Sequence, residues 1–454
     1  MKKTAALSII LIVLCLALAT FVGCDLGDTG TSGERETESM NGNGNGNADD
    51  PDDESSVDEV IDNEFEFKSI DSTSCVLVKA VYAAGDVVIP ATSPDGLTVT
   101  KIGDEAFIGC KDIKSVSFPE SVTQIGNSAF KNCESLTTVI MGEGIKKIDV
   151  DAFHNCTALE EVHTSDLYKW CNISFSNSYS NPVSYAHNLY LDGELIVDLV
   201  IPRGVWSVKA YSFEYCYSIE SVTIPNDVEK IEYGAFSCCK ALKSVEMAES
   251  VKNIGSYAFY FCTELQSVPN LNGVKTIDSH AFAQCESIET LNIPKGIEKV
   301  SEYAFVDCVG LTELTVETGD QIIDALAFKG CKGIQKASLP ANMLNMLYHG
   351  EFVELTVTVG ANILPESCSF DTNLKVVVIG ENIETIGDRA FKGCTSLKEI
   401  TLPVSLTKIG NKAFEYCAAL ETVNYAGSEE EWNNIKGIDR IPDGVKINFN
   451  CTAQ

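Results

Sequence analysis

The chain has 454 residues, a net charge of −32 and 18 cysteines. A chain this acidic is not expected to bind nucleic acid or an anionic membrane surface, because both repel negative charge. An ordinary globular protein of this length would form two or three domains. A repeat that runs through most of the chain predicts a single stack of similar units instead.

Residues 1–23 are predicted to be a lipoprotein signal peptide. Two lysines precede a nearly pure apolar run over residues 5–19, the usual order in a secretory leader. The run is too short for a permanent membrane span. The segment Phe21-Val22-Gly23-Cys24 resembles a bacterial lipoprotein cleavage box, which implies that Cys24 carries the lipid. Because Phe21 replaces the usual Leu, two alternatives stay open: ordinary cleavage that releases a soluble protein, and an uncleaved anchor.

Residues 24–64 are predicted to hold the lipid anchor at Cys24 and an acidic, disordered linker. From residue 25 to residue 64 there are 14 acidic residues and one basic residue, so this stretch carries a net charge of −13. Such a composition cannot bury enough apolar surface to fold. Residues 65–454 then carry −21. A calcium site in the acidic run is an alternative, but a solvated spacer is the preferred interpretation.

A 23-residue repeat dominates the rest of the sequence. Each unit has the approximate form Cys-x-x-Leu-x-x-Val-x-Ile-Pro-x-x-Val-x-x-Ile-Gly-x-x-Ala-Phe. The Phe recurs with a constant spacing of 23 residues within each of three groups: Phe107, Phe130 and Phe153; Phe213, Phe236, Phe259, Phe282, Phe305 and Phe328; and Phe391 and Phe414. A fixed period in this range is typical of a solenoid, in which each unit buries its apolar face only against its neighbours.

The residue types within one unit predict its local structure. The Val-x-Ile segment alternates apolar and polar residues, as a half-buried strand does, and the following Pro ends the strand because it has no N–H to donate. The Gly-x-x-Ala-Phe-x-x-Cys stretch should curl back as a turn or a short helix. The predicted fold class is therefore an α/β solenoid, a rod of ~23-residue turns with one parallel strand per turn and short helices or turns on the other face.

This pattern resembles the BspA-type leucine-rich repeat. Close variants of the family's run, Ile-Gly-x-x-Ala-Phe-x-x-Cys-x-x-Leu-x-x-Val-x-Ile-Pro, stand at residues 231–247, 254–271 and 386–403, and the resemblance extends over about residues 85–450. It implies a leucine-rich repeat rod displayed on a cell surface, with adhesion to host matrix proteins or to other cells as its function.

The extent of the regular repeat gives the boundaries of the two caps. Residues 65–100 are expected to form an N-terminal cap, and residues 101–424 the repeats. Residues 425–454 should form a C-terminal cap, in which the start at Ser428 with Glu431 three residues later predicts a short capped helix.

The 23-residue spacing breaks twice within the repeats. An aromatic-rich insert occupies residues 164–200, and a similar insert is familiar in the resembled family. We expect its aromatic side chains to pack over the stack, and a ligand site there is the alternative. Irregular turns occupy residues 340–380, with Phe352 and Phe370 as displaced anchors.

Cysteine forms a second column in the repeat. Stacked turns would bring its thiols about 4.8 Å apart, farther than the roughly 3.5–4.5 Å between the Cβ atoms of a disulfide, so a reduced, buried column is predicted. A disulfide that involves Cys75 or Cys451 remains an alternative. The members of the column follow the anchoring Phe by three residues: Cys110, Cys133, Cys156, Cys216, Cys239, Cys262, Cys285, Cys308, Cys331, Cys394 and Cys417.

The sequence contains no recognisable catalytic or metal-binding pattern. The five histidines have no metal-ligand spacing, and there is no phosphate loop, dinucleotide fingerprint or nucleophile elbow. We therefore predict that the protein is not an enzyme and needs no cofactor or metal. A hydrolase that uses the insert, with Asp166 or His187 in its site, is the remaining enzymatic alternative.

What the repeats do offer is a long face of outward-pointing strand residues. The middle residue of each Val-x-Ile segment points away from the core. The predicted partner is a protein or glycan at the cell surface, and the predicted location is the cell envelope, with the membrane reached through the N-terminal lipid. Alternatives are a structural envelope scaffold without an external ligand, and the simple suitability of Ser and Thr for exposed strand positions. The candidate binding face comprises Thr223, Glu246, Asn292, Thr315, Thr401 and Asn424.

Overall fold

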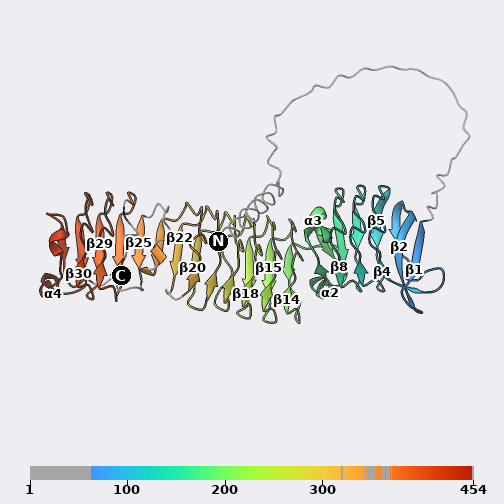
Figure 1. The fold of residues 1–454 in the computed structure, drawn as a ribbon, viewed down its shortest axis with the longest axis horizontal. Helices are drawn as coiled ribbons and strands as arrows, with labels where there is room; N and C mark the ends of the chain where they lie inside the picture. Colours follow the sequence, from blue (N-terminus) through green and yellow to red (C-terminus); the bar gives the residue numbers. More distant parts are fainter. Residues whose placement is uncertain are drawn as a thin grey trace, which may run out of the picture. The chain divides into compact units, whose positions relative to one another are not determined.

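The structure is a computed structural model that describes residues 63–317, 321–341, 343–344, 353–358, 363–364, 369 and 371–451. These residues all belong to one compact unit, residues 60–454. Within it, the strands of successive turns lie side by side (Figure 1). The predicted signal peptide, Cys24 and almost all of the linker lie outside the described residues.

The Val-x-Ile segments form the predicted parallel strands. Val222, Thr223 and Ile224 pair in register with the equivalent residues of the next turn, and the two apolar residues are buried while the middle one is not. We call this set of strands the main ladder. Its members are β3 (Gly85–Val88), β5 (Ile113–Ser117), β7 (Thr138–Ile140), β9 (Glu161–Thr164), β11 (Leu189–Leu191), β12 (Glu194–Leu195), β13 (Asp198–Val200), β15 (Ser221–Ile224), β17 (Ser244–Met247), β20 (Thr290–Ile293), β22 (Glu313–Val316), β24 (Lys336–Leu339), β25 (Glu354–Val357), β27 (Val376–Ile379), β29 (Glu399–Leu402), β31 (Thr422–Tyr425) and β32 (Lys446–Asn448).

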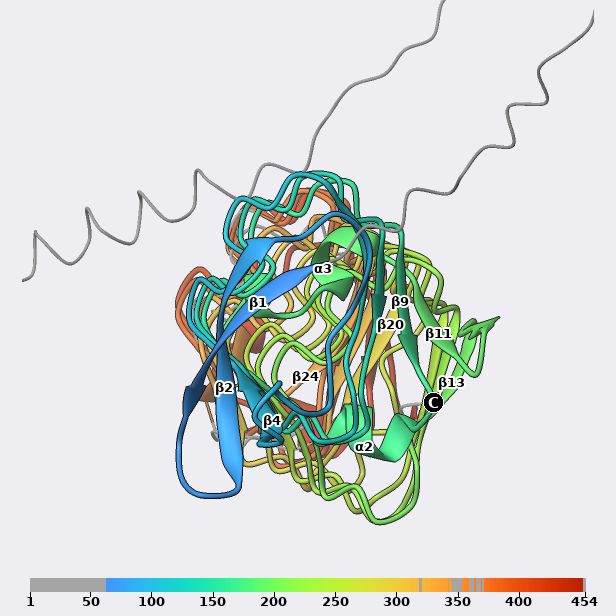
Figure 2. The ribbon, with the colours of Figure 1, turned by 90° about the vertical axis from the view of Figure 1, so that its right-hand side faces the viewer.

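Most turns contain a second strand that the repeat pattern does not predict. It is usually two residues long and ends at the Ile before the Gly, and two residues are too few for an alternating pattern to reveal a strand. Figure 2 shows this short ladder, labelled at β2 (Ser74–Tyr82) and β4 (Thr98–Ile102), on the opposite side of the turns from main-ladder strands β9, β11 and β20. After the terminal strands, its members are β4 (Thr98–Ile102), β6 (Gln124–Ile125), β8 (Lys147–Ile148), β10 (Ser174–Phe175), β14 (Ser207–Val208), β16 (Lys230–Ile231), β18 (Asn253–Ile254), β19 (Thr276–Ile277), β21 (Lys299–Val300), β23 (Ile322–Ile323), β26 (Ile363–Leu364), β28 (Thr385–Ile386) and β30 (Lys408–Ile409).

The main ladder is divided into three sheets. One contains β3 to β12, the next contains β13, β15 and β17, and the third runs from β20 to β32. Between β17 and β20, the segment with Val268, Pro269 and Asn270 forms no main-ladder strand. Pro269 takes the middle position of the Val-x-Ile segment, and a proline there removes a ladder hydrogen bond. The break separates Glu246 from Asn292 on the candidate binding face.

A column of stacked phenylalanines fills the interior, as predicted. The ring of Phe259 lies 5.3 Å from that of Phe236 and 5.2 Å from that of Phe282, and both pairs are within 10° of parallel. The backbone of each Phe also links neighbouring turns. The Phe236 N–H donates to the Ala258 carbonyl at 2.8 Å, and the Phe236 carbonyl accepts from the Cys262 thiol at 3.2 Å.

The predicted cysteine column has the same interior position. Ten of its eleven members are buried, and Cys110 is partly buried. Burial raises the pKa of the Cys285 thiol to about 12, so this thiol stays protonated at neutral pH and can donate its hydrogen. The column thus satisfies backbone carbonyls of the Phe column. The thiols that donate to the Phe carbonyl of the preceding turn are those of Cys133, Cys156, Cys239, Cys262, Cys285, Cys308, Cys331 and Cys417.

The N-terminal cap is an antiparallel pair, β1 (Glu64–Ser69) with β2 (Ser74–Tyr82). β2 then pairs in parallel with β4 and so joins the short ladder. The Phe65 ring lies 5.8 Å from Phe107 and covers the first ring of the column. Strand β1 begins at Glu64, one residue inside the linker that the sequence predicts, because Phe65 already belongs to the core.

The C-terminal cap contains the predicted capped helix, α4 (Glu429–Asn433), and a final strand, β32. Ser428 and Glu431 form a reciprocal capping box at the start of α4. Trp432 is buried, with its ring 5.2 Å from Tyr425 at the end of β31. A short 3₁₀ helix, η3 (Ile438–Arg440), follows. These elements cover the last apolar layer of the stack.

The insert forms one enlarged turn with the helices α2 (Leu167–Cys171), η1 (Ser178–Ser180) and α3 (Val183–Ala186). Its strand β10 pairs with β8 in the short ladder, and its strand β11 pairs with β9 in the main ladder. Trp170 is 1% exposed, and its indole N–H donates to the Ser212 carbonyl at 3.1 Å. The prediction that aromatic residues pack over the stack is confirmed for Trp170. Tyr168 and Tyr179 remain exposed.

The irregular turns at 340–380 keep the main ladder intact. Ala337 pairs with Leu355, and Leu355 pairs with Val377. The predicted displaced anchors, Phe352 and Phe370, lie outside the described residues. The ladder therefore tolerates turns whose length differs from the usual repeat.

The Phe column should dominate the stability of the stack. Replacement of Phe259 with Ala removes a ring that is packed on both sides and is expected to cost about 3–5 kcal/mol. Thermal unfolding followed by circular dichroism would measure this loss. The matched control is Tyr416→Ala, since Tyr416 is 65% exposed and its loss should change stability little. Equal melting temperatures for the two variants would contradict the role of the column.

Candidate functional site

The outward side of the main ladder is the candidate binding face. The structure brings the predicted residues together pairwise rather than into one site. The segment around Pro269, which lacks a main-ladder strand, separates the first pair below from the second. Strands β24, β25 and β27 lie between the second pair and the third. The three neighbouring pairs are Thr223 with Glu246, Asn292 with Thr315, and Thr401 with Asn424.

Thr401 does not belong to an accessible face. The sequence predicts it to point outward, but it is only 9% exposed. Val378 and Asn424 are its neighbours in register on the two flanking strands. The Asn424 side-chain amide donates to the Glu399 carboxylate at 2.6 Å, so it lies across β29. Thr401 is therefore less accessible than the outward pattern predicts, and its contact with a partner stays a prediction.

A more prominent outward row lies in the first sheet of the main ladder. Ile140 pairs with His163, His163 with Tyr190, and Tyr190 with Leu195. Ile140 is 46% exposed and Leu195 is 40% exposed, while the rings of His163 and Tyr190 stack at 4.7 Å. We call these four residues the apolar row. Exposed apolar and aromatic side chains in one place commonly mark interaction sites.

The repeat pattern does contain a signal for the apolar row. Ile140 occupies the middle position of its Val-x-Ile segment, where most units have a small polar residue such as Ser117 or Thr223. A large apolar residue at an outward position is therefore visible in the sequence. Tyr190 and Leu195 could not be assigned in this way, because they belong to the insert and only the structure places them on the ladder.

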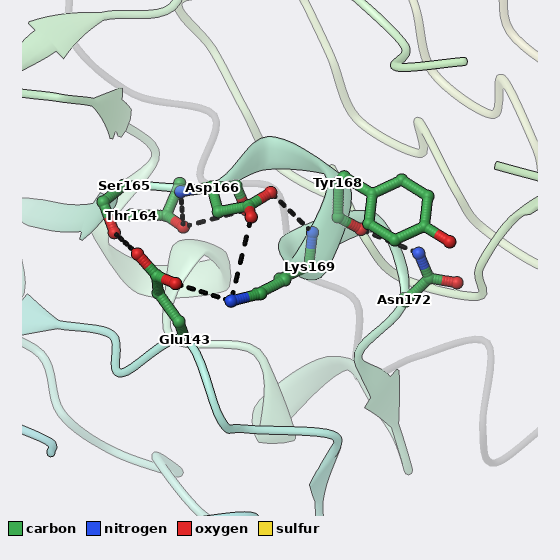
Figure 3. Close-up of polar contacts among 7 residues, drawn as sticks. All are labelled: Glu143, Thr164, Ser165, Asp166, Tyr168, Lys169 and Asn172. Atoms are coloured by element: carbon green, nitrogen blue, oxygen red, sulfur yellow. Dashed lines mark hydrogen bonds and ion pairs between the residues drawn. The ribbon is translucent and has the colours of Figure 1, made fainter. Parts of the chain in front are cut away.

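The start of the insert carries a polar cluster (Figure 3). The Lys169 ammonium lies 2.5 Å from the Glu143 carboxylate, and the Ser165 hydroxyl donates to the same carboxylate at 3.0 Å. The hydrogen bond from Lys169 lowers the pKa of Glu143. Asp166 caps helix α2 by accepting the Lys169 N–H at 3.1 Å. These contacts hold the helix against the preceding turn, and they give Asp166 a structural role.

His187, the second residue of the hydrolase hypothesis, also has a structural role. It ends helix α3 in a left-handed conformation, with φ 60°, and its ring stacks on Tyr217 at 4.1 Å. Burial lowers its pKa, so the imidazole is neutral at neutral pH. Across the described ranges, no cluster of three or more His, Cys, Asp or Glu side chains is suited to a metal ion.

Glu214, which follows the anchoring Phe213, is a buried carboxylate in contact with the insert. It is 8% exposed, and its Oε2 has no hydrogen-bond partner. Burial raises its pKa from 4.5 to about 7, and a hydrogen bond with Ser178 of η1 offsets part of the rise. In most other units the equivalent residue is exposed or half-buried, as Ile108 and Lys131 are, although Ser237 and Ala283 are buried. The insert therefore shields a group that titrates near neutral pH.

The repeating strands, the Phe column and the two caps together define a leucine-rich repeat solenoid. The family model of the BspA-type leucine-rich repeat region matches residues 91–191, 184–312, 270–358 and 362–435. These matches span most of the chain, so the protein belongs to this family. The assignment indicates a repeat scaffold of the kind associated with protein–protein interaction, and no enzyme family is indicated.

Solved structures of bacterial leucine-rich repeat proteins are similar to this chain. One from Bacteroides ovatus is 25% identical, with a TM-score of 0.58, over 86% of this chain and 99% of its own. A leucine-rich cell surface protein from Faecalibacterium prausnitzii is 24% identical, with a TM-score of 0.36, over 83% of this chain and 97% of its own. No protein with curated annotation matches. In the described part of the chain, no helix has the length and apolar character that a membrane span requires.

Glu214 should make the insert less stable as the pH rises. Between pH 4.5 and about 7 the carboxyl is neutral in the folded protein and ionised in the unfolded chain. Its stabilising effect is therefore fully present below pH 4.5 and is lost as the pH rises through 7, by about 3 kcal/mol. Hydrogen exchange of the backbone amides of residues 178–186, corrected for the intrinsic pH effect, would measure the change.

Glu214→Gln should remove this pH dependence, because the amide stays neutral. The matched variant Glu246→Gln changes an exposed carboxylate and should leave the dependence intact. The same pH profile in both variants would show that Glu214 is not responsible.

Proposed function

We propose that this protein is a membrane-tethered, surface-exposed leucine-rich repeat protein that binds a macromolecular partner through the outward side of its main ladder. The partner is a host matrix protein or a protein on another cell. The apolar row is the observation that carries the proposal. It places an isoleucine, a histidine, a tyrosine and a leucine side by side on four strands, where a partner could cover them.

The polar part of the face suits the margin of such an interface. Thr223, Glu246 and Asn292 are partly or fully exposed and lie on turns that follow the apolar row along the stack. Interfaces commonly combine a central apolar contact with a polar margin that contributes less energy. We therefore assign the largest share of binding energy to the apolar row.

The membrane tether is inferred from the N-terminal sequence alone. The leader over residues 1–23 and the cleavage box before Cys24 favour lipid attachment at Cys24. The acidic linker that follows would let the repeat unit stand away from the bilayer. The same features would serve an envelope scaffold with no external ligand, so exposure on the cell surface needs a test of its own.

The proposal also implies that the protein is not an enzyme. Asp166 and His187 serve as the cap of one helix and the end of another. A repeat scaffold acts by presenting a surface, and its activity should be measurable as binding.

Binding of residues 60–454 to extracellular matrix proteins should depend on the apolar row. Tyr190→Ala and Ile140→Ala are each expected to weaken binding about tenfold or more, because truncation of a central interface residue commonly costs over 1 kcal/mol. Thr223→Ala, Glu246→Ala and Asn292→Ala should each have a smaller effect. Surface plasmon resonance would measure both sets. Full binding by the Tyr190 and Ile140 variants would move the site away from the row.

The repeat unit should be exposed on intact cells and should depend on Cys24. Brief protease treatment of whole cells is expected to release fragments of residues 65–451. Replacement of Cys24 with Ser should shift the protein from the membrane fraction to the medium or the soluble fraction, because the lipid attachment site is lost. Complete protection from protease would favour the envelope scaffold instead.

A further inference from the structure

A row of aromatic side chains lies next to the middle sheet of the short ladder. Each follows one of the paired strands β14, β16, β18, β19 and β21 by two or three residues. Consecutive ring centroids lie 5.4, 5.3, 4.7 and 5.1 Å apart. We call this set the aromatic row: Tyr211, Tyr233, Tyr257, His280 and Tyr303.

The aromatic row is accessible to a ligand. Tyr233 is 45% exposed, and the other four residues are partly exposed. Tyr260 extends the surface, with its ring 5.5 Å from Tyr257. In the other turns with an anchoring Phe the corresponding position holds a residue that is not aromatic: Glu105, Ser128, Asp151, Leu326, Arg389 or Lys412. The aromatic surface is therefore a local feature that the repeat does not require.

The backbone conformation shows that local structure does not select these aromatic residues. Tyr211, Tyr257, His280 and Tyr303 have φ values of 64°, 60°, 58° and 58°. A bulky side chain is unfavourable in this left-handed region, where Gly or Asn is preferred. Three tyrosines of the row, Tyr211, Tyr257 and Tyr303, thus occupy positions that are unfavourable for them, which indicates that their rings serve another purpose.

The row carries little net charge, although the whole chain is strongly acidic. Lys209 and Glu232 form an ion pair of 3.2 Å near its first rings. At its other end, Lys329 lies 5.5 Å from the Tyr303 ring, and the oppositely charged Glu302 acts on His280. Burial lowers the pKa of His280, so that ring is neutral. A ligand of this surface is therefore expected to be uncharged.

The spacing of the rings distinguishes between classes of extended ligand. A β-strand presents side chains on one face about every 7 Å, and a polyproline helix repeats about every 9 Å. Neither period matches the ring spacing of the aromatic row. An extended chain of β-linked six-membered sugar rings advances by nearly the same distance per sugar as the row advances per ring. Sugar C–H groups can pack on aromatic rings, and sugar hydroxyls can bond to the phenol groups.

We propose that the aromatic row, Tyr211, Tyr233, Tyr257, His280 and Tyr303, is a binding site for a neutral β-linked glycan, with one sugar placed at each turn. The site is separate from the main ladder, so it is independent of the protein-binding function proposed above. One scaffold would then carry a protein-binding face and a glycan-binding face on different sides of its turns.

Isothermal titration of the full chain with β-1,4-linked N-acetylglucosamine and glucose oligomers tests this assignment. Affinity should rise with oligomer length up to five sugars, because five rings form the row, and then level off. Tyr257→Asn and Tyr303→Asn should each weaken binding about fivefold to tenfold. Both variants should keep their melting temperature, because Asn is favourable at positive φ.

Tyr416→Asn is the matched control. Tyr416 is exposed and has φ 67° but lies outside the aromatic row, so its loss should leave glycan affinity unchanged. Thr223→Ala, on the main ladder, should also leave it unchanged. The assignment is overturned if no oligomer binds at millimolar concentration or if the two row variants bind as the unchanged protein does. It is also overturned if these variants abolish binding of a matrix protein instead.

Discussion

The stacking of one Phe on the next is the contact on which the whole structure depends. A ring such as that of Phe259 is stacked on both faces. The Phe236 backbone donates to Ala258 and accepts from the Cys262 thiol, both in the following turn. A single 23-residue unit cannot bury enough apolar surface to offset its loss of conformational entropy. The ladders then follow, because stacked rings at about 5 Å hold successive strands at hydrogen-bonding distance.

The same constraint explains why function can be placed only on certain residues. Interior positions repeat nearly unchanged, as Phe236, Phe259 and Phe282 do. Outward positions are free to vary, and they vary in blocks: the apolar row of the first main-ladder sheet and the aromatic row beside the second short-ladder sheet. A solenoid can therefore carry different binding surfaces on different sides without a change in its core.

Much of the fold could be predicted from the sequence, because the same pattern of apolar residues around an anchoring Phe occurs eleven times. The Val-x-Ile strands, the Phe and Cys columns and the helix after Ser428 follow from local patterns. The two-residue strands of the short ladder could not be predicted, since their pairing is visible only between turns. Pro269 does indicate the break between β17 and β20 in the main ladder, because it occupies the middle of a Val-x-Ile segment.

The candidate face was harder to predict, because exposure depends on neighbours that are distant in sequence. Thr401 follows the outward pattern but is covered from the adjacent strands. Glu214 is buried where Ser178 of the insert contacts it, and Tyr190 lies beside His163 because β11 joins the main ladder. Alternation within a strand indicates a direction for each side chain, whereas accessibility is decided by what packs next to it.

Removal of one complete repeat tests the stacking account most directly. Deletion of residues 283–305 joins Phe282 to Val306 and preserves the Phe-x-x-Cys spacing, so neighbouring rings and strands can stack again. The account predicts a cooperatively folded protein whose melting temperature changes little. Deletion of residues 283–294 removes about half a turn and should lower that temperature sharply. Equal losses from the two deletions would contradict the claim that turn-to-turn stacking holds the structure together.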